Sequence, residues 1–425
     1  MEKKNNRRQI LVFAHLLEMV EPVYMGLLSS EYARGKEIFS FSYSEGWLKS
    51  DYSQILDPDL HFYSGTQYLG DEKVNFGIFL DSSPDRWGRI LMKRRESVLA
   101  KIENRTEKSL KESDYLLGVF DGNRMGALRF KESFNGPFLN DNDKLATPPW
   151  TSLKELEIIS LKLEDDNVIE NPEYWNWLNM LVNPGSSLGG ARPKATVLDK
   201  ENRLWIAKFP SQNDGKDIGG WEMVAYELAK NAGINISVSK AQKFSSKHHT
   251  FLTKRFDRAS NGERIHFASA MTMLGYSDGA DFHDGVSYLE IVDFLSNKGA
   301  NVEQDLEELW RRIVFNIFIA NTDDHLRNHG FMLTDKGWIL SPAFDINPNE
   351  NGTGLSLNIS LDDNSLDLEL PLVLINYFRL NKEKALNIIE TIRKSVSNWR
   401  IVAKKFGLSK IEQKQMAKVF DRYCK

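Results

Sequence analysis

Acidic and amide side chains gather in one polar stretch, residues 321–328, which reads Asn-Thr-Asp-Asp-His-Leu-Arg-Asn. Asp323 is followed five residues later by Asn328, and Asp345 comes seventeen residues after Asn328. An acid, an amide and a second acid in this order are typical of protein kinases. There one Asp accepts a hydroxyl proton, while an Asn and a later Asp hold Mg²⁺ on the phosphates. The spacing therefore indicates phosphoryl transfer; a polar loop whose acids cap helices is the alternative interpretation.

A lysine stands inside an apolar segment that we expect to be a strand, residues 204–209. Lys208 is costly to bury there unless it meets an anion. Kinases place such a lysine against ATP phosphates and pair it with a helix glutamate, and Glu222 opens the next predicted helix, fourteen residues later. An edge-strand lysine that points to solvent is the alternative.

Two further segments could contact a nucleotide. Residues 185–194, Gly-Ser-Ser-Leu-Gly-Gly-Ala-Arg-Pro-Lys, offer backbone freedom and N–H groups for phosphate approach. They do not form a Walker A motif, because Pro193 and Lys194 replace its Gly-Lys-Ser/Thr ending. Residues 253–258, Thr-Lys-Arg-Phe-Asp-Arg, end a predicted strand and could form the hinge beneath an adenine. A simple turn and a charged strand end are the respective alternatives.

The helices and strands that must position these residues are predicted from hydrophobic periodicity and from segments rich in Gly, Pro and other turn-forming residues. Strands are predicted over residues 10–14 and 37–43, the second from alternating aromatic residues, and a helix runs from a start signal at 83–85 to about 101. Residues 135–149 are rich in breakers, so we place a domain boundary near residue 148. Beyond it we expect an antiparallel strand pair at 196–198 and 204–209, helices at 221–232 and 306–320, and a helical region from about 380.

Composition bounds the class of protein. The 425 residues suggest two or three domains, and 55 Lys+Arg against 59 Asp+Glu give a net charge of −4. That balance excludes a chain-wide electrostatic footprint for DNA or membrane. The single cysteine, Cys424, excludes an intrachain disulfide. No signal peptide and no run of about 18 apolar residues is found, so we expect a cytoplasmic protein with no membrane association.

One predicted helix carries a basic segment formed by Arg86, Arg89, Lys93, Arg94 and Arg95. A solvated helix face is the expected interpretation. A contact with protein or nucleic acid is the alternative.

With these motifs in order, the chain resembles the HipA-type serine/threonine kinase toxins almost end to end. Residues 39–48 and 80–88 look like the N-terminal domain of that family, and the motifs from residue 187 to Asp345 look like its kinase core. The resemblance implies an α+β fold. A small β-rich N-terminal domain, residues 1–148, would precede a two-lobed kinase-like core, residues 149–425. Its N-lobe would span about 149–260 and its helical C-lobe about 261–425.

The resemblance also implies roles for the site residues. Asp323 is the catalytic base, and Asn328 and Asp345 hold Mg²⁺. The expected ATP contacts are Lys208 at the phosphates, Lys254 and Phe256 at the adenine, Asp257 near the ribose, and Gly189 and Gly190 in the glycine-rich loop.

The family phosphorylates a serine of its own glycine-rich loop, and the resemblance places that serine at Ser187, with Ser186 adjacent. A phosphate would add about −1.5 to −2 charges to a loop that must approach ATP, so it should shut the enzyme off. Arg192-Pro193 and Asp324 depart from the better-known family pattern, which leaves the substrate open. The expected partners are a protein substrate, with a translation component as one candidate, and a helix-turn-helix antitoxin through which any DNA contact would be indirect.

Three functions compete on these grounds. An active kinase toxin accounts for every motif. A degenerate kinase-fold module that only binds an antitoxin or another partner is the alternative. A metal-dependent phosphohydrolase using Asp323, Asp324 and Asp345 would leave Lys208 and the glycine-rich loop unexplained.

Overall fold

The computed structural model describes residues 7–33, 35–70, 72–165, 168, 171–181, 190 and 192–424. The chain forms two compact units. Unit 1 comprises residues 1–206 and 257–268, and unit 2 comprises residues 207–256 and 269–425. The division falls within strand β7 (Leu204–Lys208). The domain boundary expected near residue 148 stays a prediction.

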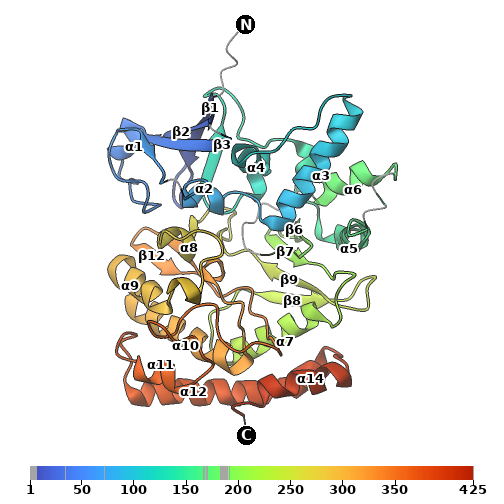
Figure 1. Ribbon diagram of the computed structural model, residues 1–425, viewed down its shortest axis with the longest axis vertical. Helices are drawn as coiled ribbons and strands as arrows, with labels where there is room; N and C mark the ends of the chain where they lie inside the picture. The colour runs from blue at the N-terminus through green and yellow to red at the C-terminus, as the bar shows by residue number, and fades with distance from the viewer. Residues whose placement is uncertain are drawn as a thin grey trace. The chain divides into compact units, whose positions relative to one another are not determined.

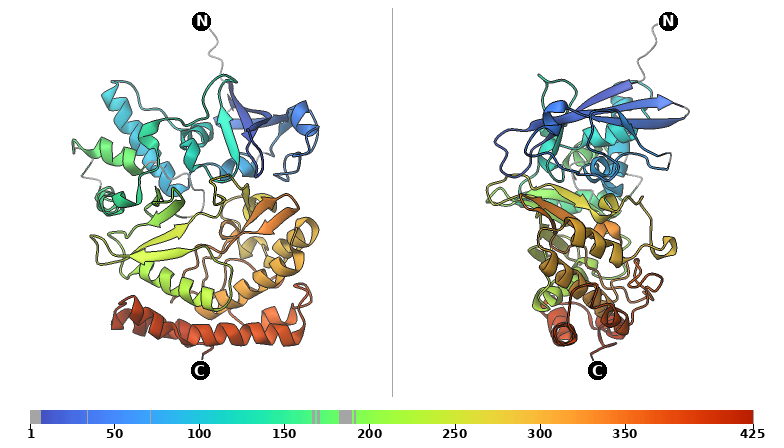
Figure 2. Two further views of the ribbon diagram at one scale, coloured as in Figure 1. Left: turned by 180° about the vertical axis from the view of Figure 1, so that it is seen from behind. Right: turned by 90° about the vertical axis from the view of Figure 1, so that its left-hand side faces the viewer.

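A five-stranded antiparallel sheet forms the first part of unit 1, in the order β4-β3-β2-β1-β5. Its strands are β1 (Arg7–Ala14), β2 (Val23–Ala33), β3 (Lys36–Tyr43), β4 (Gln67–Tyr68) and β5 (Leu128–Lys131), and the first three lie side by side in Figure 2. The alternating aromatic residues Phe39, Phe41 and Tyr43 of β3 are all buried, as a half-buried strand requires. The strands predicted at 10–14 and 37–43 are confirmed.

Helices complete unit 1 (Figure 1). They are α1 (Glu45–Leu48), α2 (Gly77–Asp81), α3 (Arg86–Ile102), α4 (Glu112–Gly118), α5 (Leu153–Lys162) and α6 (Tyr174–Leu181). The long helix α3 packs against α4 and α6. It begins at Asp85, whose carboxylate accepts a hydrogen bond from the Gly88 N–H at 2.8 Å. Strand β6 (Lys194–Leu198) neighbours β7, which confirms that the two predicted strands pair.

Unit 2 contains the antiparallel pairs β8 (Ser239–Gln242) with β9 (Thr250–Lys254), and β11 (Gly330–Thr334) with β12 (Gly337–Leu340). Helix α7 (Ile218–Asn231) is followed by Gly233 in the left-handed conformation, with φ of +79°, as its sequence predicts. In helix α10 (Val302–Ile319) the last two turns, residues 313–319, are buried and apolar except for Asn316.

The other elements of the chain are mostly helical. They are β10 (Phe267–Ser269), α8 (Ala270–Met273), α9 (Tyr288–Lys298), α11 (Glu369–Val373), α12 (Lys382–Ser397), α13 (Trp399–Lys405) and α14 (Lys410–Phe420). Helix α12 packs against both α7 and α10, and Figure 1 shows it in red with α14 as an outer layer of unit 2. This confirms the helical C-terminal region and the mixed α+β class. In the part of the chain that the structure describes, no helix has the length and apolar character needed to span a membrane.

Candidate active site

Lys208 is the last residue of β7, and its side chain is buried between two carboxylates of unit 2. Its Nζ atom lies 2.5 Å from Oε1 of Glu222 on α7 and 2.6 Å from Oδ1 of Asp345. Burial lowers the pKa of Lys208, but the two carboxylates outweigh burial and hold that pKa above its usual value. The lysine is therefore a fixed cation, and the solvent-facing alternative is wrong for Lys208.

The loop after α10 carries Asp323 and Asn328. Helix α10 ends at Ala320, in the left-handed conformation with φ of +47°, which turns the chain sharply out of the helix. A short 3₁₀ turn, Leu326–Asn328, follows before β11. The Asn328 amide donates to the Asp323 backbone oxygen at 2.8 Å, so the two predicted site residues are tied together.

The carboxylate of Asp323 is exposed, whereas that of its neighbour Asp324 is buried. Partial desolvation raises the pKa of Asp323. The negative charges of Asp345 and Asp324 raise this pKa further, whereas His325 and Arg327 act to lower it, and the net shift is upward. An exposed carboxylate next to a second acid is suited to receive a proton from a hydroxyl group.

Asp324 was not predicted as an anchor, yet three buried side chains bind it. Its Oδ2 atom accepts hydrogen bonds from the Tyr288 hydroxyl at 2.5 Å and the Asn316 amide at 2.8 Å, and lies 2.8 Å from Nε2 of His329. Burial raises the pKa of Asp324, but His329 and these hydrogen bonds outweigh burial, so that the pKa is lowered. The anchor fixes the loop from which Asp323 projects.

A chain of asparagines connects this loop to Asp345. The amide of Asn321 donates to Oδ1 of Asn316 at 3.0 Å, and the backbone N–H of Asn347 donates to Oδ1 of Asn321 at 3.2 Å. The amide of Asn347 then donates to Oδ1 of Asp345 at 2.9 Å. Asp345 itself has φ of +57°, an unusual conformation for a residue other than glycine. A buried asparagine within the apolar helix α10 is the sequence signal that could have revealed this network.

The oxygen atoms at the site fit a hard cation. Among the described residues, Oδ1 of Asn328 is buried and has no hydrogen-bond partner. The described residues contain no group of three or more His, Cys, Asp and Glu side chains that could hold a metal. One amide oxygen and the Asp345 carboxylate are nonetheless the donor set that Mg²⁺ uses when phosphate oxygens and water complete its shell.

The predicted hinge residues end β9. Lys254 donates its backbone N–H to Val238 at 2.8 Å, and the ring of Phe256 lies 5.5 Å from the ring of Phe344, which precedes Asp345. A cavity of about 10 Å³ lies between Glu222 and Asp345 and has room for about one water molecule. A nucleotide would therefore have to lie outside this cavity.

The remaining predicted ATP contacts belong to unit 1 or lie outside the described residues. Gly190 has φ of +95° and accepts a hydrogen bond from Lys194 at 3.3 Å. Asp257 is fully buried, and its Oδ2 accepts from the Gly126 N–H at 2.9 Å and from Arg258 at 2.6 Å, which does not support a ribose contact. Ser186, Ser187 and Gly189 lie outside the described residues.

The sequence matches the family model of the HipA-like C-terminal domain over residues 186–400, half of the chain. The chain belongs to the HipA-like family. The matched segment contains Lys208, Asp323, Asn328 and Asp345, so the HipA-like assignment and the geometry refer to the same residues.

One of two curated relatives carries the HipA name, and the other is described as a kinase. The serine/threonine-protein kinase toxin HipA of Shewanella oneidensis is 25% identical over 266 residues, which are 55% of this chain and 59% of the relative. A protein of Haemophilus influenzae is 27% identical over 179 residues, which are 38% of this chain and 52% of the relative. The matches thus span a little more than half the length of these curated relatives.

A solved structure extends the HipA-like fold to the whole chain. The complex of HipA, HipB and operator DNA from Shewanella oneidensis MR-1 matches with a TM-score of 0.64 at 18% identity. The match covers 98% of this chain and 96% of that one. At this identity the likeness concerns the fold.

Proposed function

We propose that this HipA-like chain is an ATP- and Mg²⁺-dependent serine/threonine protein kinase that acts as the toxin of a toxin–antitoxin pair. The observation that carries the proposal is Lys208, buried between Glu222 and Asp345 in the unit that also holds Asp323 and Asn328. A buried lysine paired with a helix glutamate, together with an Asp and an Asn on a loop, is the set of parts that phosphoryl transfer requires.

In this proposal each residue has one task. Asp323 orients the substrate hydroxyl and accepts its proton as the oxygen attacks the γ-phosphorus, and ADP leaves when the bond between that phosphorus and the bridging oxygen breaks. Lys208 neutralises negative charge on the phosphates, with Glu222 holding its Nζ atom in place. Asn328 and Asp345 would hold Mg²⁺, which neutralises charge on the transferred group. Lys254 and Phe256 border the adenine, and Gly189 and Gly190 approach the phosphates.

Regulation and partners complete the proposal. We propose that the kinase phosphorylates its own Ser187, and that the added charge expels the loop from the phosphates. The Shewanella relative is solved with HipB and operator DNA, which supports a DNA-binding antitoxin as the partner of this chain. The substrate is proposed to be a cellular protein, with a translation component as one candidate.

The test is incubation of the purified full chain with labelled ATP and Mg²⁺, alone and with cell lysate, beside Asp323→Asn. The variant keeps the shape of the side chain and removes the charge that accepts the proton. We expect labelled protein from the wild type only, and phosphate on Ser187 by mass spectrometry.

Other outcomes separate the competing functions. Release of free phosphate without labelled protein would indicate a phosphohydrolase. No ATP turnover, together with capture of an antitoxin, would indicate a degenerate binding module. Phosphate on Ser187 in both proteins would mean that another kinase adds it.

A further inference from the structure

The basic segment of α3 is neither a uniformly solvated face nor a free cationic stripe. Arg89 forms an ion pair with Glu112, Arg94 donates to the backbone oxygen of Leu163, and the guanidinium of Arg95 lies 5.7 Å from the ring centre of Trp175. Lys93 is different, because it is exposed and forms no ion pair with any described residue. One turn after Arg89, its side chain projects from the same face of the helix.

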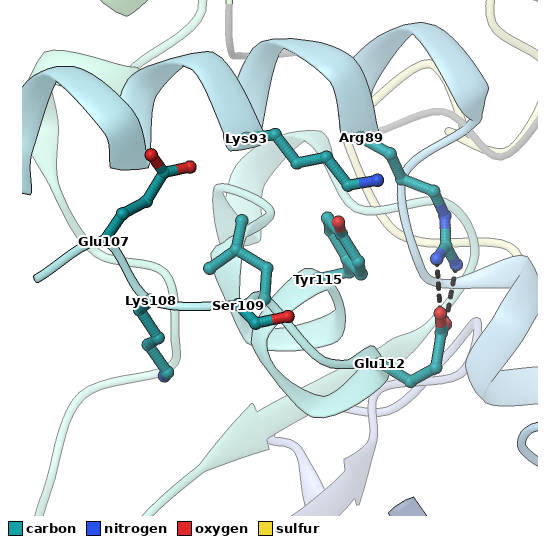
Figure 3. A pocket seen from close by; sticks show the side chains of 8 residues that line it. Arg89, Lys93, Glu107, Lys108, Ser109, Glu112 and Tyr115 are labelled. Atoms are coloured by element: carbon teal, nitrogen blue, oxygen red, sulfur yellow. Dashed lines mark hydrogen bonds and ion pairs between the residues drawn. The ribbon is translucent and has the colours of Figure 1, made fainter. Parts of the chain in front are cut away.

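Lys93 lines a pocket of about 550 Å³ in unit 1, between α3, residues 107–110 and α4. This volume lies within the range of about 300–1,000 Å³ that is typical of small-molecule sites. Figure 3 shows Arg89 directed from α3 at Glu112, Lys93 reaching from α3 above the ring of Tyr115 toward Arg89, and Glu107 at the other end of the pocket.

Two ion pairs remove most of the charge of the pocket, and one of them fixes part of its frame. Arg89 binds both carboxylate oxygens of Glu112, at 2.5 and 2.7 Å, and its guanidinium lies 4.6 Å from the ring centre of Tyr115. Lys108 lies 2.5 Å from Asp114. Such a bidentate pair holds its side chains in a fixed geometry. Both cations are already neutralised, so the pocket offers little to a polyanion such as nucleic acid.

The groups that stay available are one cation, one anion and two hydroxyls. Among the described residues, Lys93 and Glu107 have no ion-pair partner and do not pair with one another. The hydroxyls of Ser109 and Tyr115 likewise have no hydrogen-bond partner within the described part of the chain. Leu110 and the Tyr115 ring add apolar surface.

We propose that this pocket binds a zwitterionic ligand, a free amino acid or a short peptide. Lys93 and the two hydroxyls would bind its carboxylate, Glu107 would bind its ammonium group, and Leu110 with Tyr115 would contact its apolar part. Two unpaired opposite charges in one pocket fit a ligand that carries both charges, because each end of such a ligand can contact a group of the opposite sign. The inference does not depend on kinase activity.

The test measures binding to the full chain by calorimetry. The probes are the twenty free amino acids and the twenty Gly-Xaa dipeptides, with N-acetylated and C-amidated forms of each probe that binds. We expect one of the two probe classes to bind with Kd below about 1 mM. Each blocked form should bind at least tenfold more weakly.

Variants assign the two charges. Lys93→Ala should weaken a free-carboxylate probe at least tenfold and leave its C-amidated form unchanged. Glu107→Gln should weaken a probe with a free ammonium group at least tenfold and leave its N-acetylated form unchanged. Both side chains are exposed and unpaired, so the variants should fold like Lys101→Ala, an exposed cation of α3 outside the pocket that should bind like the wild type. Absence of binding by every probe, or binding that neither variant weakens, would overturn the proposal.

Discussion

His329 and Asp324 hold together the ends of the loop that carries Asn328 and that begins directly after Asp323. The Nε2 atom of His329 lies 2.8 Å from Oδ2 of Asp324, and both side chains are buried. The loop between them spans only four residues, so this contact restrains its backbone from within. Asp323 and Asp324 are adjacent in sequence, but Asp323 is exposed and is the proposed proton acceptor, whereas Asp324 is buried and anchors the loop.

Asp324→Ala should therefore weaken both the fold and the site. The change leaves Tyr288, Asn316 and His329 buried around a missing acceptor, and we expect the free energy of unfolding to fall by about 3 kcal/mol. Urea denaturation measures this loss, and phosphorylation of Ser187 should fall with it. Asp362→Ala, at an exposed position, is the control and should behave like the wild type. Wild-type stability of Asp324→Ala would show that the buried network is not an anchor.

Lys208→Met should abolish phosphoryl transfer and lower the free energy of unfolding by about 3 kcal/mol. The change removes the cation that contacts the buried Glu222 carboxylate at 2.5 Å, and the loss of one partner from a buried ion pair is costly. Adding Glu222→Gln should recover part of the stability without restoring activity, because the phosphates would still lack their cation. Labelled-ATP assays and urea denaturation on the single and double variants give the two readouts. Activity in either variant would contradict the role of Lys208.

Asp345→Ala should reduce the affinity for ATP mainly when Mg²⁺ is present. Mg²⁺ is held by few protein oxygens, at about 2.0–2.1 Å, so the loss of one carboxylate is severe. Calorimetric titration of ATP with Mg²⁺ and with EDTA separates the metal from the nucleotide. Asp335→Ala, exposed in the turn between β11 and β12, is the matched control. An unchanged magnesium dependence in Asp345→Ala would rule out Asp345 as a ligand.

Asp57 predicts a pH dependence of stability. Its carboxyl is fully buried in unit 1 and accepts the Ile78 N–H at 3.0 Å, and burial raises its pKa from 3.8 to about 6. The folded state thus binds the proton more tightly than the unfolded state. The resulting stabilisation is complete below about pH 4 and is lost as pH rises through 6, by up to about 3 kcal/mol.

Asp57→Asn should flatten this dependence, because the amide does not titrate. Urea denaturation between pH 4 and 7 compares its slope with that of the wild type and of Asp51→Asn, which changes an exposed acid. Equal slopes in all three proteins would show that Asp57 does not titrate in this range.

Much of the fold could be predicted from local patterns. Helix α10 follows from its apolar periodicity, and the end of α7 follows from Gly233, because both depend on residues within a few turns of one another. Strand β2 was not predicted. It lies between β1 and β3, and its stability comes from pairing with both of them. A pattern within one short segment cannot predict such pairing.

The sequence by itself determined which side chains could do chemistry. The order of Asp323, Asn328 and Asp345, and a lysine in an apolar strand fourteen residues before Glu222, follow from residue type and spacing alone. Spacing could not distinguish a solvent-facing lysine from one bound by two carboxylates.

Only the tertiary structure decided burial and partners. Asp324 is buried whereas Asp323 is exposed, and Asp257 accepts a hydrogen bond from the Gly126 backbone. Lys93 and Glu107 stay unpaired in one pocket, although the neighbouring Arg89 and Glu112 form an ion pair. The physical reason is that the task of a charged group depends on its desolvation and on the groups within hydrogen-bond distance. Most of those groups come from segments that are remote in sequence and adjacent only after folding.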